Sequence, residues 1–154
     1  MGFVEAIKSF YGRYFDFQTR SSRSEFWWIV LFQIVVTIVL MVPLFGGMAG
    51  IAKSGVLEDN PMAIYGAFFS LSGLPIVLFS LMNFIPGIAL GVRRIHDFDK
   101  SGWLYLIVFI GGFIPLISLI VGIGWIVVNC IRGTVGDNSY GPDPLGESVY
   151  ETFN

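Results

Sequence analysis

The chain has 154 residues, of which 55% are hydrophobic and only 13% are charged, whereas soluble domains carry about 25% charged residues. Together with a mean hydropathy of +0.74, this composition excludes an ordinary water-soluble domain and predicts an integral membrane protein. The formal net charge of -2 also excludes the basic surface that nucleic-acid binding requires.

The first apolar pattern lies before any long hydrophobic run. Phe3, Ile7, Phe10 and Tyr14 are separated by alternating gaps of four and three residues, which on a helix forms a single apolar stripe. This spacing predicts an amphipathic helix within a cytoplasmic segment at residues 1–25. The stripe fits two locations equally: the membrane interface, or the surface of the protein's own helical bundle.

Three stretches contain no Asp, Glu, Lys or Arg: residues 26–52, 60–92 and 101–131. Each exceeds the roughly 20 residues that a helix needs to cross a bilayer. In the third stretch, Gly111, Gly112 and Pro115 are consistent either with a kink in one helix or with the turn of a short hairpin. We therefore predict three crossings, or four if the third stretch folds back, within a transmembrane region at 26–131.

Lysines and arginines predict the orientation because cytoplasmic segments are enriched in them. The first loop contains only Lys53, whereas most of the other cations precede the first span or occupy the second loop: Lys8, Arg13, Arg20, Arg23, Arg93, Arg94 and Lys100. This bias predicts a cytoplasmic N-terminus and a cytoplasmic polar loop at 93–102. The tail has only Arg132, so charge leaves its side open.

The C-terminal segment at 132–154 is rich in Gly, Pro, Asp, Asn and Ser. Pro142 and Pro144 disfavour helical angles at the residues before them. We predict a nonhelical polar tail. The whole chain is then a single all-α membrane domain at 1–154: a polytopic transmembrane helical bundle with an N-terminal interfacial amphipathic helix.

Three polar islands border the hydrophobic stretches. The first is Phe17, Arg20, Arg23, Glu25, Phe26 and Trp27; the second is Arg93, Arg94, His96, Asp97, Ser101, Gly102 and Trp103; the third is Gly133, Thr134, Gly136, Asn138, Tyr140, Gly141, Pro142, Asp143 and Pro144. In their order and their residue types, the three islands resemble the motifs of the DUF805 family over residues 17–144. Thr19 replaces the glycine of the first motif, and Ile95 and Lys100 replace the leucine and arginine of the second.

This resemblance implies a multi-pass protein of the bacterial inner membrane. The family has no assigned function, so the resemblance leaves the mechanism open. Familiar catalytic motifs are absent, and a single His96 and a single Cys130 exclude a Cys/His metal cage and an intrachain disulfide. We expect neither a metal nor another cofactor, and we predict no catalytic residue.

The candidate binding residues come from the three islands: Arg20, Arg23, Glu25, Arg93, Arg94, His96, Asp97, Lys100, Trp103, Asn138 and Asp143. The cations form a predicted collar at headgroup depth, where each attracts anionic lipid by about 1 kcal/mol, unless they only anchor the topology. Glu25 is expected to pair with Arg93 or Arg94. His96 either titrates beside its carboxylate neighbours or hydrogen-bonds to backbone at a helix end.

Two function classes remain. The favoured one is a nonenzymatic protein whose cytoplasmic cluster binds anionic membrane lipids or a protein partner, with a homo-oligomer as a further option and no nucleic-acid partner. The alternative is a membrane-embedded enzyme or small transport component that uses Glu25, His96, Asp97 and Asp143 on an amphiphilic substrate. That alternative requires those four groups to meet in one pocket.

Overall fold

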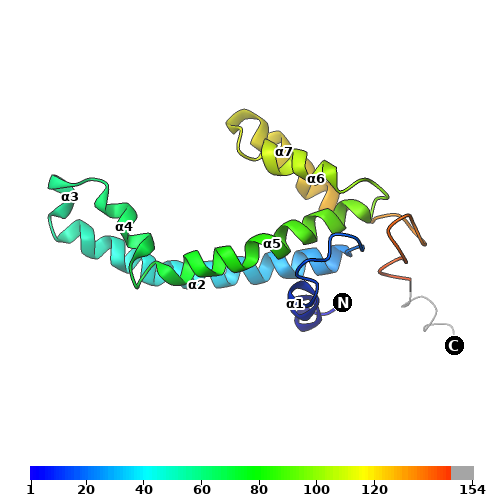
Figure 1. The fold of residues 1–154 in the computed structure, drawn as a ribbon, viewed down its shortest axis with the longest axis horizontal. Helices are drawn as coiled ribbons and strands as arrows, with labels where there is room; N and C mark the ends of the chain where they lie inside the picture. The colour runs from blue at the N-terminus through cyan, green and yellow to red at the C-terminus, as the bar shows by residue number, and fades with distance from the viewer. Residues whose placement is uncertain (147–154) are drawn as a thin grey trace. The chain divides into compact units, whose positions relative to one another are not determined.

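A computed structural model describes residues 1–146, which contain seven helices joined by loops and no β-strand (Figure 1). The part of the predicted polar tail at 147–154 lies outside this range. The chain forms two compact units: the first contains residues 1–30 together with the chain from residue 85 onward, and the second is Leu31–Phe84. All the lysines and arginines except Lys53 belong to the first unit.

Helix α1 (Phe3–Gly12) begins with a local cap, because Glu5 Oε2 accepts a hydrogen bond from the Gly2 backbone N–H at 2.8 Å. Ala6 and Phe10 have no exposed surface and pack in one cluster with Ile29 and Leu90. Of the predicted stripe, Phe10 is therefore buried and Ile7 packs against the same cluster, whereas Phe3 is 40% exposed.

Two helices are long and apolar enough to cross a membrane: α2 (Arg23–Lys53) and α5 (Leu74–His96). At about 1.5 Å per residue both exceed the roughly 30 Å hydrocarbon thickness. In the second unit they are connected through α3 (Val56–Asp59) and α4 (Ala63–Phe69). There the rings of Phe32 and Phe79 pack edge to face with centroids 6.1 Å apart.

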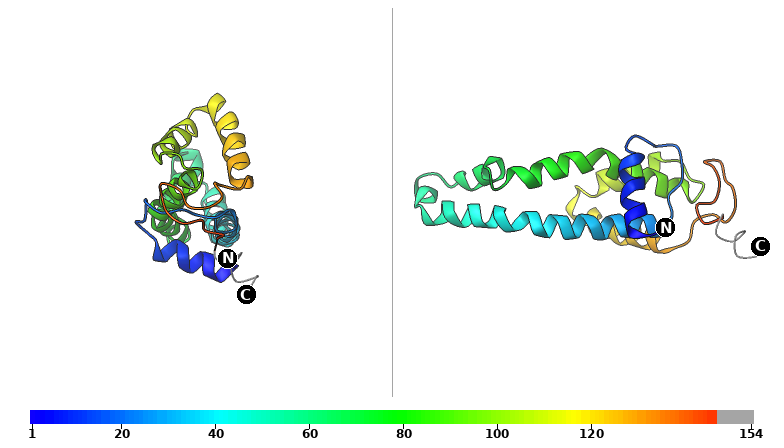
Figure 2. Two further views of the ribbon diagram at one scale, coloured as in Figure 1. Left: turned by 90° about the vertical axis from the view of Figure 1, so that its right-hand side faces the viewer. Right: turned by 90° about the horizontal axis from the view of Figure 1, so that it is seen from below.

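The third hydrophobic stretch is a hairpin, not a kinked helix. Helices α6 (Trp103–Gly111) and α7 (Pro115–Cys130) lie side by side and are joined by a short turn at residues 112–114 (Figures 1 and 2). At about 14 Å and 24 Å, both are shorter than the roughly 30 Å that a bilayer core requires. The stretch that was predicted as a further crossing thus contains no helix of full spanning length.

The end of α7 returns to the place where α6 begins. Arg94, near the end of α5, donates from Nη2 to the carbonyl oxygen of Val128 at 2.9 Å, and Trp27 Nε1 donates to that of Asn129 at 3.2 Å. The described tail, which contains no helix, therefore starts at the same end of the first unit as α1 and the loop between α5 and α6. Charge pattern alone left this position open.

Candidate functional site

The three polar islands, far apart in sequence, meet in the first unit around buried ion pairs. We call Arg13, Arg20, Arg93, Arg94, Glu25 and Asp97 the arginine cluster. All of them are buried except Arg13, and Arg93 and Arg94 have no exposed surface. A buried charge is costly unless it is paired and hydrogen-bonded, so the arrangement depends on how completely each group finds partners.

Asp97 holds two arginines from different segments. Its Oδ1 accepts hydrogen bonds from Arg20 Nε at 3.1 Å and Nη2 at 2.9 Å, and its Oδ2 accepts one from Arg94 Nη1 at 2.5 Å. The first and second polar islands are therefore joined through one carboxylate.

Backbone oxygens complete the hydrogen bonding of these two arginines. Arg20 donates to the third-island carbonyls of Thr134 at 2.6 Å, Gly136 at 2.8 Å and Gly141 at 3.3 Å. Arg94 donates to the carbonyl of Ile131 at the end of α7, and the Thr134 N–H donates to the Asp97 carbonyl at 2.7 Å. The described part of the nonhelical tail thus supplies backbone acceptors to the buried Arg20.

Glu25 forms the second centre of the arginine cluster. Its two carboxylate oxygens accept from Arg13 Nη2 at 2.6 and 2.7 Å, and Ser9 donates to it at 3.0 Å. Arg93 Nη2 lies 3.8 Å from Glu25 Oε1. Of the two partners that the sequence suggested for Glu25, the structure pairs it with Arg93, while Arg94 pairs with Asp97.

Arg93 joins α5 to the segment before α2. Its Nε donates to Ser21 Oγ at 3.0 Å, and its Nη1 donates to the carbonyls of Arg13 at 3.0 Å and Asp16 at 2.9 Å. Asp16 itself is held by hydrogen bonds. Partial burial opposes ionisation, but the Thr19 hydroxyl and the N–H groups of Gln18 and Thr19 keep the pKa of Asp16 below its usual value.

His96 lies at the end of α5 and bonds to backbone, as one of the two readings of the sequence expected. Its Nδ1 lies 3.3 Å from the carbonyl oxygen of Thr19; because that oxygen only accepts, Nδ1 carries the proton. The ring stacks on Tyr140 at 3.7 Å with an interplanar angle of 8°. Asn138 donates to the His96 carbonyl at 2.9 Å, so the third island also caps α5.

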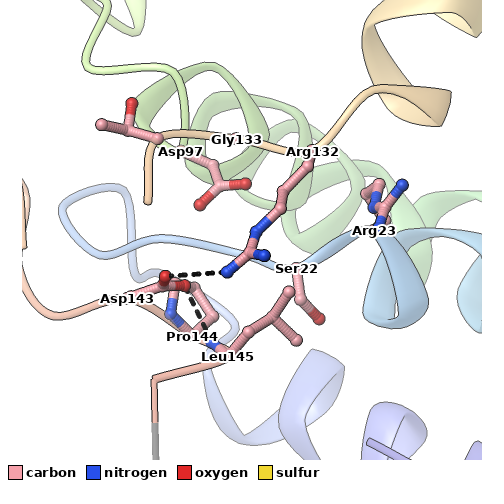
Figure 3. A pocket seen from close by; sticks show the side chains of 9 residues that line it. Ser22, Arg23, Asp97, Arg132, Gly133, Asp143, Pro144 and Leu145 are labelled. Atoms are coloured by element: carbon pink, nitrogen blue, oxygen red, sulfur yellow. Dashed lines mark hydrogen bonds and ion pairs between the residues drawn. The ribbon is translucent and has the colours of Figure 1, made fainter. Parts of the chain in front are cut away.

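Four cations remain exposed around the arginine cluster, and we call them the rim cations: Lys8, Arg23, Lys100 and Arg132. Arg23 donates to the Cys130 carbonyl at 3.1 Å, and Arg132 lies 3.5 Å from Asp143 (Figure 3). Trp103, another predicted site residue, is 77% exposed. Predicted collar residues therefore divide into a buried set and an exposed set.

Asp143 fixes the turn of the tail beside Arg132. It accepts from the backbone N–H groups of Leu145 at 2.9 Å and Gly136 at 3.1 Å. Slight burial opposes ionisation, but these two hydrogen bonds and the charges of Arg20 and Arg132 keep the pKa of Asp143 below its usual value. The carboxylate is therefore ionised at neutral pH and structural in its contacts.

Cavities in the first unit differ greatly in size. The hollow beside Asp97, Arg132 and Asp143 (Figure 3) measures about 10 Å³, room for about one water molecule. A polar hollow of about 370 Å³ is lined by residues that include Arg13, Arg20, Glu25 and Asp143. An apolar groove of about 580 Å³ lies between α5 and α6.

The four groups that the enzyme alternative needs are divided among these hollows. Glu25 and Asp143 line the polar hollow, whereas His96 lines the groove and Asp97 lines the smallest hollow.

Several functional contacts were missed from sequence. Arg13 was counted only as a topological cation, yet it is the closest partner of Glu25. Tyr140 was identified only as part of a motif, yet it stacks on His96. The hydroxyl groups of Ser9 and Ser21 bind buried charges. No sequence periodicity links these pairs, because they join segments that only tertiary folding brings together.

Gly133 provides a local test of how the tail is held. A Cβ at this position would collide with the Asp97 carboxylate and carbonyl oxygen. Gly133→Ala should therefore displace the tail from the arginine cluster and raise the hydrogen-exchange rate of the Thr134 amide, which donates to the Asp97 carbonyl. Hydrogen–deuterium exchange in detergent measures this effect. Gly124→Ala is the control, because a Cβ there meets nothing within 4 Å; an equally protected Thr134 in both variants would contradict the packing.

Comparison with known proteins gives consistent relatives. The family pattern described as protein of unknown function (DUF805) matches residues 14–142. The chain is 32% identical over 145 residues to inner membrane protein YhaH of Escherichia coli K12, covering 92% of this chain and 94% of the relative. It is 30% identical over 146 residues to inner membrane protein YhaI of the same strain, covering 92% and 93%. No solved structure matches significantly.

Proposed function

Because the chain belongs to the DUF805 family, whose relatives YhaH and YhaI are inner membrane proteins, we propose that it is a nonenzymatic inner-membrane protein whose cytoplasmic face binds anionic lipid headgroups. The chain is a membrane protein with two helices of spanning length, α2 and α5. We infer the ligand of the cytoplasmic face from the chemistry of the arginine cluster and its rim cations.

Topology supports the choice of face. Within the first unit, α1, the loop between α5 and α6, and the start of the tail are tied together by the arginine cluster. That unit contains every lysine and arginine except Lys53, and such an excess favours the cytoplasm. The return of α7 to this end supports a re-entrant hairpin at α6 and α7, with the tail on the same side as the N-terminus.

The observation that carries the proposal is the division between buried and exposed cations. All three guanidinium nitrogens of Arg20 already donate to protein acceptors, as do most of those of Arg93 and Arg94. These arginines hold the fold and have little left to offer a ligand. The rim cations Lys8, Arg23, Lys100 and Arg132 are exposed, and exposed cations of this kind attract the phosphate groups of anionic lipids.

The contacts of the carboxylates disfavour the enzyme alternative. Glu25 and Asp97 are each approached by two guanidinium groups and are buried, so neither is available as a general base. The polar hollow takes in Glu25 and Asp143, but Asp97 and His96 lie outside its lining, and no carboxylate lines the groove beside His96. The four groups that an enzyme would need do not share one cavity.

The test compares lipid retention in wild type and in a rim variant, Lys8→Gln, Arg23→Gln, Lys100→Gln. Native mass spectrometry of protein released from phosphatidylglycerol nanodiscs should show retention reduced by about tenfold or more, since each cation near an anionic surface contributes roughly 1 kcal/mol. Retention from phosphatidylcholine nanodiscs should be weak in both proteins.

Lys53→Gln is the matched control, because it removes a cation from the second unit and should leave retention unchanged. Equal phosphatidylglycerol retention in the wild type and the rim variant would overturn the proposal and favour a protein partner. Variants of Arg93 or Arg94 are unsuitable here, because their loss disturbs the fold itself.

A further inference from the structure

The groove between α5 and α6 has a volume of about 580 Å³, and none of the residues that form the ion pairs above lines it. We propose that this groove binds one acyl chain of an anionic phospholipid, with the headgroup at the end formed by His96, Ser101 and Tyr140. This deepens the proposed function and rests on it, because it names the place where a lipid is held.

Two stripes of side chains form the walls of the groove. On α5, Ile88, Val92 and His96 follow one another at intervals of four residues and so share one face of the helix. On the facing helix α6, the lining includes Leu106 and Phe109. The α5 stripe changes from apolar Ile88 and Val92 to polar His96 at the end of the helix, and Ser101, just before α6 begins, also lines the groove.

This gradient matches the polarity of a lipid. A volume of about 580 Å³ falls within the roughly 300–1,000 Å³ of ligand clefts and is far too large and apolar to be held by ordered water. Most of its lining residues come from the uncharged stretches at 60–92 and 101–131, whose length and composition suit a hydrocarbon environment, while Phe17, His96 and Tyr140 come from outside them. The acyl chain of a phospholipid fits such apolar walls, and the ester and headgroup that follow the chain fit the polar end of the groove.

The polar end is held in place by close packing. Stacking on Tyr140 and the hydrogen bond to Thr19 fix the ring of His96. Gly102 packs directly against that ring, because a Cβ there would lie 2.8 Å from His96 Nε2 and 2.6 Å from Val92 Cγ1. Lys100, exposed and next to Ser101, supplies positive charge at this end. The nearby Asp99 carboxylate is engaged by the Ser139 N–H at 3.1 Å.

Filling the groove tests the proposal. Leu106→Trp places a large ring in the groove, whereas Ile107→Trp places the same ring on a residue of α6 that does not line it. In native mass spectrometry from phosphatidylglycerol nanodiscs, wild type and Ile107→Trp should retain one lipid, and Leu106→Trp should lose it by about tenfold or more. Ile88→Trp, on the opposite wall, should behave like Leu106→Trp if the latter fails to fold.

Each outcome separates this proposal from the previous one. If the rim variant loses phosphatidylglycerol while Leu106→Trp retains it, the groove proposal is overturned and headgroup binding stands. If Leu106→Trp loses the lipid and the rim variant retains it, the groove holds the acyl chain, but the headgroup contact with Lys100 is overturned together with the rim proposal. Retention of added palmitate in place of phosphatidylglycerol, or a dimer that Leu106→Trp abolishes, would assign the groove to a free fatty acid or to a second copy and overturn the proposal.

Discussion

Asp97→Asn should destabilise the protein by about 3–5 kcal/mol, the usual cost of leaving buried charges without their partner. Two arginines depend on this carboxylate, and their side chains are at most 1% exposed, so neither can turn to water. The tail should also loosen, because Arg20 orients the carbonyls of the third island. Thermal unfolding in detergent, followed by tryptophan fluorescence, should show a midpoint lower by on the order of 10 °C.

Asp99→Asn is the matched control for this measurement. Asp99 is an exposed carboxylate two residues away, and it accepts a hydrogen bond from the Ser139 backbone N–H at 3.1 Å. Its replacement should shift the midpoint by only a degree or two, in line with surface substitutions of roughly 0.5 kcal/mol. Equal shifts in the two variants would mean that the pairing around Asp97 does not stabilise the fold.

Glu25→Gln should be the second large perturbation, again about 3–5 kcal/mol. The substitution keeps the shape of the side chain but leaves Arg13 and Arg93 without a counter-charge. Arg93 has no exposed surface, and its Nη2 faces Glu25 without a hydrogen bond among the described residues, so it loses the anion nearest to it. The same thermal measurement records the result.

Arg13→Gln separates the two ion pairs of Glu25. Its side chain is 30% exposed, and its removal leaves the buried pair between Glu25 and Arg93 in place. Glu25→Gln removes the counter-charge of both arginines, whereas Arg13→Gln removes one partly exposed cation, so Arg13→Gln should cost less than Glu25→Gln. If both variants cost the same, Arg93 gains no stability from Glu25, and the second centre of the arginine cluster consists of the Arg13–Glu25 pair alone.

Both predictions explain why polar islands border hydrophobic helices in this protein. Within the described residues, the buried apolar cluster of the first unit is small and centres on Phe10, Ile29 and Leu90. In a bilayer, apolar contacts between helices give little advantage over contacts with lipid, so hydrogen bonds and ion pairs hold segments together. The arginine cluster performs that role within the first unit.

By itself, the sequence determined the membrane class, the two long helices and the nonhelical tail. Hydrophobic length and the angles allowed before Pro142 and Pro144 are local properties, and the uncharged stretch at 26–52 has no alternative in water. The three motifs also contain five of the six residues of the arginine cluster, Arg20, Glu25, Arg93, Arg94 and Asp97, but not Arg13. These features depend on residue type and spacing and need no knowledge of distant contacts.

Only the tertiary structure decided how these residues are used. Gly111, Gly112 and Pro115 permit a kink or a turn, and the packing of α6 on α7 selects the turn. Arg93 and Arg132 contribute the same charge to the sequence pattern, yet Arg93 is buried and Arg132 is exposed. Burial and ion pairing depend on contacts between residues that are distant in sequence, such as Arg20 and Gly141. A local sequence pattern contains no information about such tertiary contacts.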